Sequence, residues 1–302
     1  HAMIGISPPY ALPTITHDAF LRYGMPGSQA PIVFAVPHAG RDYGPALLDR
    51  ARVTAATLMR LEDRYADLLA HQLIEQDHCV LIARRPRAMI DLNRDEREID
   101  PLGVADLPRH VRPHSSAKVR GGLGLVPDRL AYAGSLWRYP LSYAELCERI
   151  EQIHRPYHAM LDQALFETRQ RHGTALLVDI HSMPPLRPSI TSDSPLPRIV
   201  IGDRFGRSAS DRLTDLMADI ARRHGLEVAI NAPYSGNHIL ERHGHPEQGI
   251  HAIQIEIDRS LYLTRDLVHP GDGISTIRAL LDDLAIGLTQ ELSGPGLQLA
   301  AE

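Results

Sequence analysis

The 302-residue sequence lacks the patterns that would place it in several common protein classes. It has no run of 18 or more apolar residues and no charged-then-apolar leader, so we expect neither a membrane span nor a secretory signal. Its two cysteines, Cys79 and Cys147, form no CxxC pair, which predicts buried free thiols and a reducing cytoplasm. The net charge of −5 offers no basic footprint for nucleic acid or an anionic membrane surface.

Familiar catalytic signatures are missing as well. There is no GxSxG of a serine hydrolase, and the glycines at 121–124 form neither a GxGxxG nor a Walker pattern. HExxH is absent, and His38 is followed at the third position by Arg41, so an HxxE pair is absent too. A metal site that uses both His38 and His181 must therefore be assembled from segments that lie far apart in the sequence.

What the sequence does contain is an alternation of strand-like and helix-like segments. With 43% hydrophobic and 23% charged residues, we expect one α/β domain over residues 3–302, after a cloning remnant at 1–2 and an irregular start up to residue 30. The pattern predicts a mixed, mostly parallel sheet covered by helices on both faces. Strands are expected at 32–36, 79–83, 176–181, 198–202, 226–230 and 250–257, with a further one at 88–92; helices are expected at 64–76, 142–172 (interrupted at Pro156), 208–224 and 272–292.

Residues 95–140 differ in character from the rest of the chain. They are rich in charges and prolines and contain the glycine cluster Gly121–Gly124. A connection of this length inside a compact domain is usually functional or disordered. We therefore predict a lid or substrate-binding insertion, with the glycines as a hinge.

Two predicted strands end on a histidine. His38 follows the apolar run at 32–36, and His181 shares one strand face with Asp179. Polar groups at the carboxyl ends of strands in an α/β sheet commonly form the ligand site. Zinc hydrolases use three His or carboxylate ligands, so a third is needed. We favour Asp63 over Glu62, although Asp63 could instead be a helix N-cap.

The strand at 251–260 supplies a candidate general base. Its isoleucines share one face, and Gln254, Glu256 and Asp258 share the other. Three polar groups on one face of a central strand are costly unless they line a site. We expect Glu256 to be the base and Asp258 a supporting or structural partner. The alternative is that Glu256 forms a structural ion pair with Arg259.

Substrate binding requires positive charge if the substrate is an anion. Asn93 and Arg94 are candidates, because arginine suits bidentate binding of a carboxylate. Asn237 and Arg242, in a turn-rich segment, could add further donors. Arg94 could instead neutralise the acidic residues that follow it. His154 and His158 have the i, i+4 spacing of a metal pair, but Pro156 between them favours surface or packing roles.

An ordered set of short motifs resembles the N-formylglutamate amidohydrolase (N-formylglutamate deformylase) family. The motifs are PHAG (37–40), IDLNR (90–94), GGLGLVP (121–127), DIHS (179–182), ERHG (241–244) and QIEIDRS (254–260). The resemblance implies a fold like that of zinc carboxypeptidases and aspartoacylase, and a single zinc per chain. It also implies hydrolysis of N-formyl-L-glutamate in histidine degradation, with His38 and His181 as ligands, Glu256 as the catalytic carboxylate and Asn93-Arg94 binding the substrate carboxylate.

Together these expectations describe a cytoplasmic zinc amidohydrolase. Zinc held by His38, Asp63 and His181 would activate a water molecule, and Glu256 would transfer its proton to the departing amine. Two alternatives stay open: a hydrolase for a longer N-acyl amino acid, as in aspartoacylase, and a non-catalytic metal-binding relative. The sequence does not indicate an oligomeric state.

Overall fold

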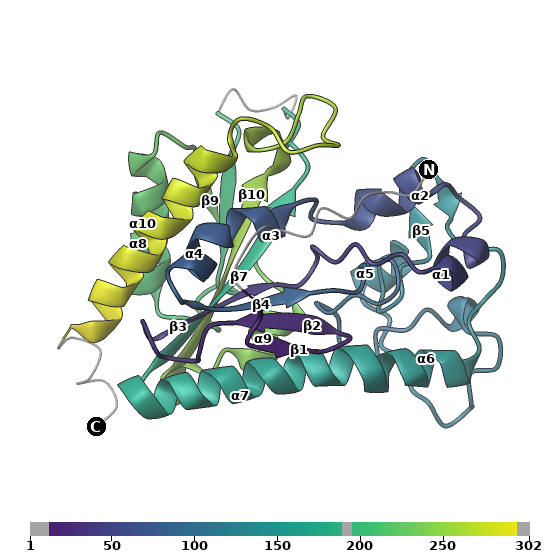
Figure 1. The fold of residues 1–302 in the computed structure, drawn as a ribbon. Helices are drawn as coiled ribbons and strands as arrows, with labels where there is room; N and C mark the ends of the chain where they lie inside the picture. The colour runs from purple at the N-terminus through teal and green to yellow at the C-terminus, as the bar shows by residue number, and fades with distance from the viewer. Residues whose placement is uncertain (1–11, 189–194, 295–302) are drawn as a thin grey trace.

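The computed structural model describes residues 12–188 and 195–294. Among these, eight strands form one sheet in the order β1-β2-β4-β3-β7-β10-β8-β9 (Figure 1). The strands are β1 (Ile15–Thr16), β2 (Phe20–Tyr23), β3 (Ile32–Val36), β4 (Cys79–Ala83), β7 (Ala175–Met183), β8 (Ile199–Gly202), β9 (Val228–Ile230) and β10 (Ile250–Asp258).

The centre of the sheet is parallel and its flanks are partly antiparallel. Strands β4, β3, β7 and β10 are adjacent and parallel, whereas β2 and β8 run antiparallel to β4 and β10. The predicted mixed, mostly parallel α/β sheet is therefore confirmed. Because β3, β7 and β10 run in the same direction, their carboxyl ends meet at one edge, which is where such sheets place ligands.

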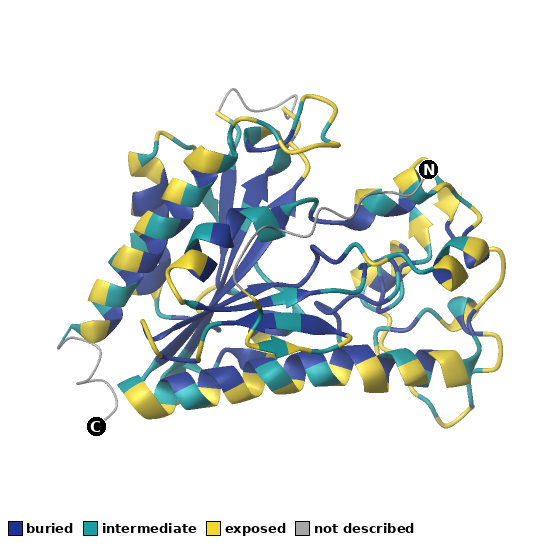
Figure 2. Ribbon diagram, viewed as in Figure 1, coloured by how far each residue is buried: buried dark blue, intermediate teal, exposed yellow. Residues whose placement is uncertain are grey.

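Helices cover both faces of the sheet, and the strands between them are buried (Figure 2). On one face lie α3 (Ala66–Leu69), α4 (His71–Glu75), α8 (Asp211–Arg223) and α10 (Ile274–Ser293). On the other lie α6 (Tyr143–Arg149), a π-helical turn η3 (Ile150–His154), the long α7 (Arg155–His172) and α9 (His238–His243). Alternate residues of β3 contact opposite layers: Phe34 packs against the first group and Val33 against the second.

Several predicted elements match the structure, and others do not. The strands at 32–36 and 79–83 have the predicted bounds. The predicted strand at 88–92 is wrong, because these residues form turns. The predicted helix at 64–76 is split into α3 and α4. The irregular start is also wrong in part: residues 15–16 and 20–23 form strands, while 1–11 lie outside the described residues.

The segment 95–140 contains short regular elements joined by loops. They are η2 (Pro101–Gly103), α5 (Ala117–Arg120) and the paired strands β5 (Arg129–Leu130) and β6 (Gly134–Ser135). The remaining short helices are α1 (Pro45–Arg50), α2 (Ala55–Leu58), η1 (Met59–Leu61), η4 (Pro246–Gln248) and η5 (Arg259–Leu261).

The structure also bears on the cysteines and on membrane-spanning helices. Both cysteines are free thiols, Cys79 buried and Cys147 half-buried. Within residues 12–188 and 195–294, no helix is both long enough and apolar enough to cross a membrane.

Candidate metal centre and surrounding cavity

Two histidines and a glutamate meet at the carboxyl end of the central strands. His38 lies two residues beyond the end of β3, and His181 lies in the neighbouring strand β7. Their rings are 4.9 Å apart between centroids. On the next strand, β10, Glu256 is in register with His181. The parallel register thus brings together three residues that are far apart in the sequence.

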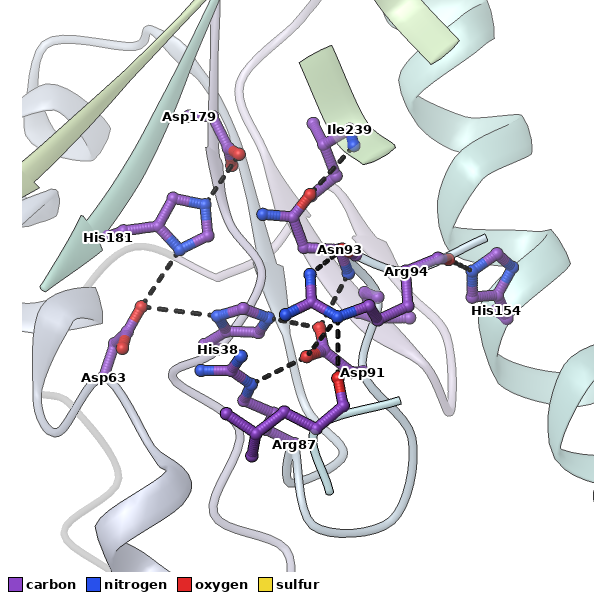
Figure 3. A network of polar contacts seen from close by, with 12 residues as sticks. His38, Asp63, Arg87, Asp91, Asn93, Arg94, His154, Asp179, His181 and Ile239 are labelled. Atoms are coloured by element: carbon purple, nitrogen blue, oxygen red, sulfur yellow. Dashed lines mark hydrogen bonds and ion pairs between the residues drawn. The ribbon is translucent and has the colours of Figure 1, made fainter. Parts of the chain in front are cut away.

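Asp63 completes the group from the segment before α3. Its Oδ2 lies 3.1 Å from His181 Nδ1 and 3.5 Å from His38 Nδ1, and these contacts are drawn in Figure 3. The amide of Asp63 donates to the carbonyl of His38 (3.0 Å), which fixes the two segments together. The N-cap of α3 is Tyr65, so Asp63 does not have the capping role that was its alternative.

Glu62, the other candidate third ligand, has different partners. It is fully buried, and it accepts hydrogen bonds from the Tyr43 hydroxyl (2.7 Å) and from Arg64 (3.1 Å). The geometry therefore brings Asp63, and not Glu62, to the two histidines.

A second carboxylate supports each histidine on its far side. His38 Nε2 donates to Asp91 Oδ1 (2.7 Å), and His181 Nε2 donates to Asp179 Oδ2 (2.7 Å) (Figure 3). Both aspartates are fully buried. Metal-ligating histidines typically donate their other ring N–H to a carboxylate in this way. These contacts leave Nδ1 of both histidines facing Asp63.

The electrostatics of the group favour a cation between these atoms. Burial opposes charge on Asp63, yet hydrogen bonds from His181 and His38 hold the pKa of Asp63 well below its ordinary value. Burial likewise opposes charge on His181, but Asp179 and then Asp63 raise its pKa well above the ordinary value. One ligand atom from each of His38, Asp63 and His181 can be chosen so that all lie within 4.8 Å of one another. The donor set thus fits a tetrahedral metal with one open position.

Glu256 lies beside this group and carries a perturbed carboxyl group. Burial raises the pKa of Glu256, and the nearby charge of Asp63 raises it further against the opposing effect of His181. A carboxyl group with a raised pKa is suited to proton transfer near neutral pH. The alternative ion-pair partner, Arg259, instead donates to Asp63 Oδ1 (2.9 Å) and to the Ser182 side chain (3.0 Å). Asp258 accepts a hydrogen bond from Arg198 Nε (2.6 Å), which is consistent with the structural role considered for it.

Asn93 and Arg94 come from the segment that follows β4. The Asn93 side-chain oxygen accepts a hydrogen bond from the amide of Ile239 (2.9 Å). Arg94 donates from Nε to the carbonyl of Leu123 (2.8 Å) and lies 3.9 Å from Asp91. Both side chains are nearly buried and line the cavity.

The acidic residues after Arg94 have other partners. Asp95 pairs with Arg97 (2.8 Å), and Glu96 pairs with Arg155 (2.9 Å). Among its described contacts, Arg94 therefore does not neutralise Asp95 or Glu96, which was the alternative role considered for it.

The cavity in front of these residues has a volume of about 210 Å³ and is rich in cationic side chains. Besides Arg94 and Arg259, its lining includes Arg60, Arg87 and Lys118. Lys118 is the only lysine in the sequence. Burial, together with Arg94 and Arg87, lowers the pKa of Lys118. A site with this charge distribution favours a small anion.

Sequence reasoning missed several of these residues. Nothing in the local sequence distinguishes Arg60, Arg87, Lys118 or Tyr234 as cavity residues, because their positions depend on tertiary packing. Asp179 did carry a signal, since its spacing of two from His181 places both on one strand face.

Asn237 and Arg242, the other two residues predicted to bind substrate, lie in different positions relative to the cavity. Asn237, at the start of α9, lines the cavity. Arg242 is not among the lining residues and instead pairs with Asp162 of α7 (3.3 Å). The structure therefore does not bring Arg242 into this group.

His154 and His158 were expected to have surface or packing roles. The structure excludes a surface position for either residue. Both are fully buried, and their ring centroids are 4.4 Å apart. Pro156 is the second residue of α7, directly after the π-helical turn η3, and the backbone stays helical through this junction, so the two rings remain adjacent.

Comparisons with known proteins agree on one family. The model of the family described as N-formylglutamate amidohydrolase matches residues 30–263. N-formylglutamate deformylase of Pseudomonas aeruginosa is 27% identical over 261 residues, covering 85% of this chain and 91% of the relative. The Pseudomonas putida enzyme of the same name is 30% identical over 234 residues, covering 77% and 82%.

Solved structures give the same picture. The crystal structure of N-formylglutamate amidohydrolase from Ralstonia eutropha superposes with a TM-score of 0.82 at 31% identity, covering 91% of this chain and 98% of that one. A gene product of Agrobacterium tumefaciens shares the fold, with a TM-score of 0.61 at 19% identity.

Proposed function

Because the chain belongs to the N-formylglutamate amidohydrolase family, we propose that it hydrolyses N-formyl-L-glutamate to formate and L-glutamate. The observation that carries this proposal is the group His38, Asp63 and His181 beside Glu256, at the edge of a cation-lined cavity. The reaction breaks the bond between the formyl carbon and the amide nitrogen, and a water molecule supplies the oxygen and the proton.

We assign one divalent metal, zinc by preference, to His38 Nδ1, His181 Nδ1 and Asp63 Oδ2. When bound there, the metal would supply a Lewis acid for the formyl oxygen and lower the pKa of the attacking water. Asp91 and Asp179 keep the two histidines oriented and protonated at Nε2.

Glu256 transfers the proton. As a carboxylate it accepts a proton from the attacking water, and as the acid it returns that proton to the departing nitrogen. Both steps need a carboxyl group whose two forms are close in energy, which is consistent with its raised pKa. Its register with His181 places it on the strand next to the proposed ligand.

The cationic lining binds the two carboxylates of the substrate. Arg94, with Asn93 and Asn237 nearby, binds one of them, and Arg87 and Lys118 contribute charge for the other. A dianion suits a pocket in which arginine and lysine outnumber the carboxylates. The volume of about 210 Å³ suits a ligand smaller than drug-sized ones, whose pockets are roughly 300–1,000 Å³.

Residues 95–140 act as a substrate-binding insertion within a single α/β domain. Three of them, Lys118, Leu123 and Leu130, line the cavity together with residues from the sheet edge. Their place in the cavity lining supports the proposal that this insertion covers the bound substrate as a lid.

The test is formate release from N-formyl-L-glutamate, compared with N-formyl-L-glutamine and N-acetyl-L-glutamate. We expect the first substrate to be turned over fastest. Removing the side-chain carboxylate should lower kcat/KM by about tenfold or more, as loss of a charged hydrogen bond typically does. Faster turnover of the acetyl compound would favour the longer-acyl alternative. No turnover of any of the three by protein with bound metal would favour the non-catalytic relative.

A further inference from the structure

A second cluster of histidines lies behind the Asn93–Arg94 segment. His154 and His158 come from η3 and α7, and His238 is the first residue of α9. The ring centroids of His154 and His158 are 4.4 Å apart, and those of His158 and His238 are 5.2 Å apart. One ring nitrogen from each of the three can be chosen so that all lie within 4.8 Å of one another.

Hydrogen bonds to backbone carbonyls define which nitrogens are available. His154 Nε2 lies 2.8 Å from the carbonyl oxygen of Arg94, a contact drawn in Figure 3, and His158 Nε2 lies 2.9 Å from that of Leu92. A carbonyl oxygen only accepts, so both Nε2 atoms carry the proton and both Nδ1 atoms of the neutral rings present a lone pair. Histidines that bind metals commonly donate their other N–H to a backbone carbonyl in this way.

Two of the cluster nitrogens are buried without a hydrogen-bond partner among the described residues. They are His154 Nδ1 and His238 Nε2. The nearest acidic atom to the first is Glu96 Oε1, at 3.7 Å. An unsatisfied buried acceptor costs free energy, so a ligand that binds both nitrogens would stabilise the fold.

The third nitrogen faces another histidine. His158 Nδ1 lies 2.8 Å from His243 Nε2, and His243 Nδ1 lies 2.8 Å from Asp162 Oδ1. His243 Nδ1 makes no hydrogen bond of good geometry among the described residues despite this contact. A His243 ring protonated at Nδ1 would face His158 Nδ1 with a second lone pair, and a cation bound to His158 would relieve that repulsion.

We propose that His154, His158 and His238 form a second metal site, distinct from the one at His38, for a divalent transition metal. Three neutral imidazoles suit Zn²⁺ and, in vitro, Co²⁺. Glu96 or water would complete the coordination. The bound ion would cross-link α7 and α9 behind the backbone that carries Asn93 and Arg94.

Metal content tests this proposal independently of activity. Protein loaded with excess Zn²⁺ and freed of unbound metal should contain two equivalents per chain by elemental analysis. His238→Gln should retain one equivalent, and His38→Ala should retain one. A matched control is His245→Gln, since His245 is half-buried, lies near Glu247 (3.6 Å) and is outside the cluster. This variant should retain two equivalents.

A second measurement avoids dependence on the folding of cluster variants. In His38→Ala, whose cluster is intact, titration with Co²⁺ should give one binding event and raise the melting temperature. The proposal would be overturned if the wild type bound one equivalent of zinc per chain and His38→Ala, but not His238→Gln, removed it. Two equivalents that His238→Gln leaves unchanged, or absence of Co²⁺ binding to folded His38→Ala, would overturn it as well.

Discussion

At the scale of single residues, the two histidines beside Asp63 each have one ring nitrogen held by a carboxylate. Asp91 holds His38, and Asp179 holds His181. The sequence allows the prediction that Asp179 and His181 share a strand face, because side chains alternate along a strand. It does not show that Nδ1 would be the free atom, since this depends on how the loop with Asp91 packs.

The first prediction concerns the support that Asp179 gives to His181. Asp179→Asn removes the carboxylate charge and should weaken zinc binding at this site by about 10–100-fold, because such outer partners orient the ligand and raise its basicity. Competition for zinc with a chromophoric chelator measures the effect.

Asp283→Asn is the matched control for this substitution. It removes another Asp–His contact, with His224 at 2.8 Å, outside the cavity, and should leave zinc affinity unchanged. Equal affinity in Asp179→Asn and the wild type would contradict a supporting role for Asp179.

The second prediction concerns Glu256. Glu256→Gln keeps the shape of the side chain but cannot accept the proton from water, so kcat should fall by about 10²–10⁴-fold. Zinc content should remain at the wild-type value. Steady-state kinetics with metal analysis on the same sample provides the measurement, and Glu247→Gln, an exposed change, should be neutral. Near-normal kcat in Glu256→Gln would assign the proton transfer to another group.

At the scale of elements, the sequence predicts best where a segment is regular and buried on both sides. The apolar runs of β3 and β4 have the predicted bounds, because a continuous apolar run suits a central parallel strand. The strand predicted at 88–92 is absent from the structure. Ala88, Ile90 and Leu92 are indeed buried, but the amide of Asn93 bonds to the Asp91 side chain, and the segment forms turns.

The split between α3 and α4 was likewise not predicted. The Leu68 carbonyl accepts a hydrogen bond from Arg278 of α10 (2.7 Å). The break itself lies at Ala70, whose ψ of 0° leaves the helical range, and Tyr65 before α3 has a left-handed backbone. Periodicity alone cannot reveal these local departures.

The third prediction concerns the contact between the loops that follow β3 and β4. A Cβ at Gly40 would lie 2.1 Å from the carbonyl oxygen of Arg85, a backbone atom that cannot rotate away. Gly40→Ala should therefore separate these loops and lower the free energy of unfolding by about 1–3 kcal/mol. Urea denaturation measures the change. Gly44→Ala, with no atom within 4 Å of the added Cβ, is the control. Equal stability of Gly40→Ala and the control would show that the loops adjust freely.

At the scale of the whole molecule, charge is distributed unevenly. The chain has a net charge of −5, yet the cavity collects Arg60, Arg87, Arg94, Lys118 and Arg259. Of these five residues, Arg94 alone was predicted from the sequence to bind substrate. The others come from separate segments, and net charge carries no information about where the fold gathers them.

The fourth prediction uses the single lysine. Because burial and two arginines lower the pKa of Lys118, more of its amine is neutral at a given pH than for an ordinary lysine. An acetylating reagent that reacts with amines should therefore modify Lys118 readily at pH 8–9 and reduce activity. N-formyl-L-glutamate should protect it.

Mass spectrometry of the Lys118 peptide, with and without substrate, follows this modification. The Lys118→Met variant is the control, because its residual activity should not respond to the reagent. Modification at the same rate with and without saturating substrate would place Lys118 outside the binding site.

The proposed mechanism requires a metal held by His38, Asp63 and His181 for amide hydrolysis. The most direct measurement is formate release from N-formyl-L-glutamate before chelation, after chelation and after Zn²⁺ is restored, with metal content determined at each stage. We predict that activity is lost with the metal and recovered with it in the wild type and in His238→Gln, but not in His38→Ala. Full turnover by protein that contains no metal would contradict the account.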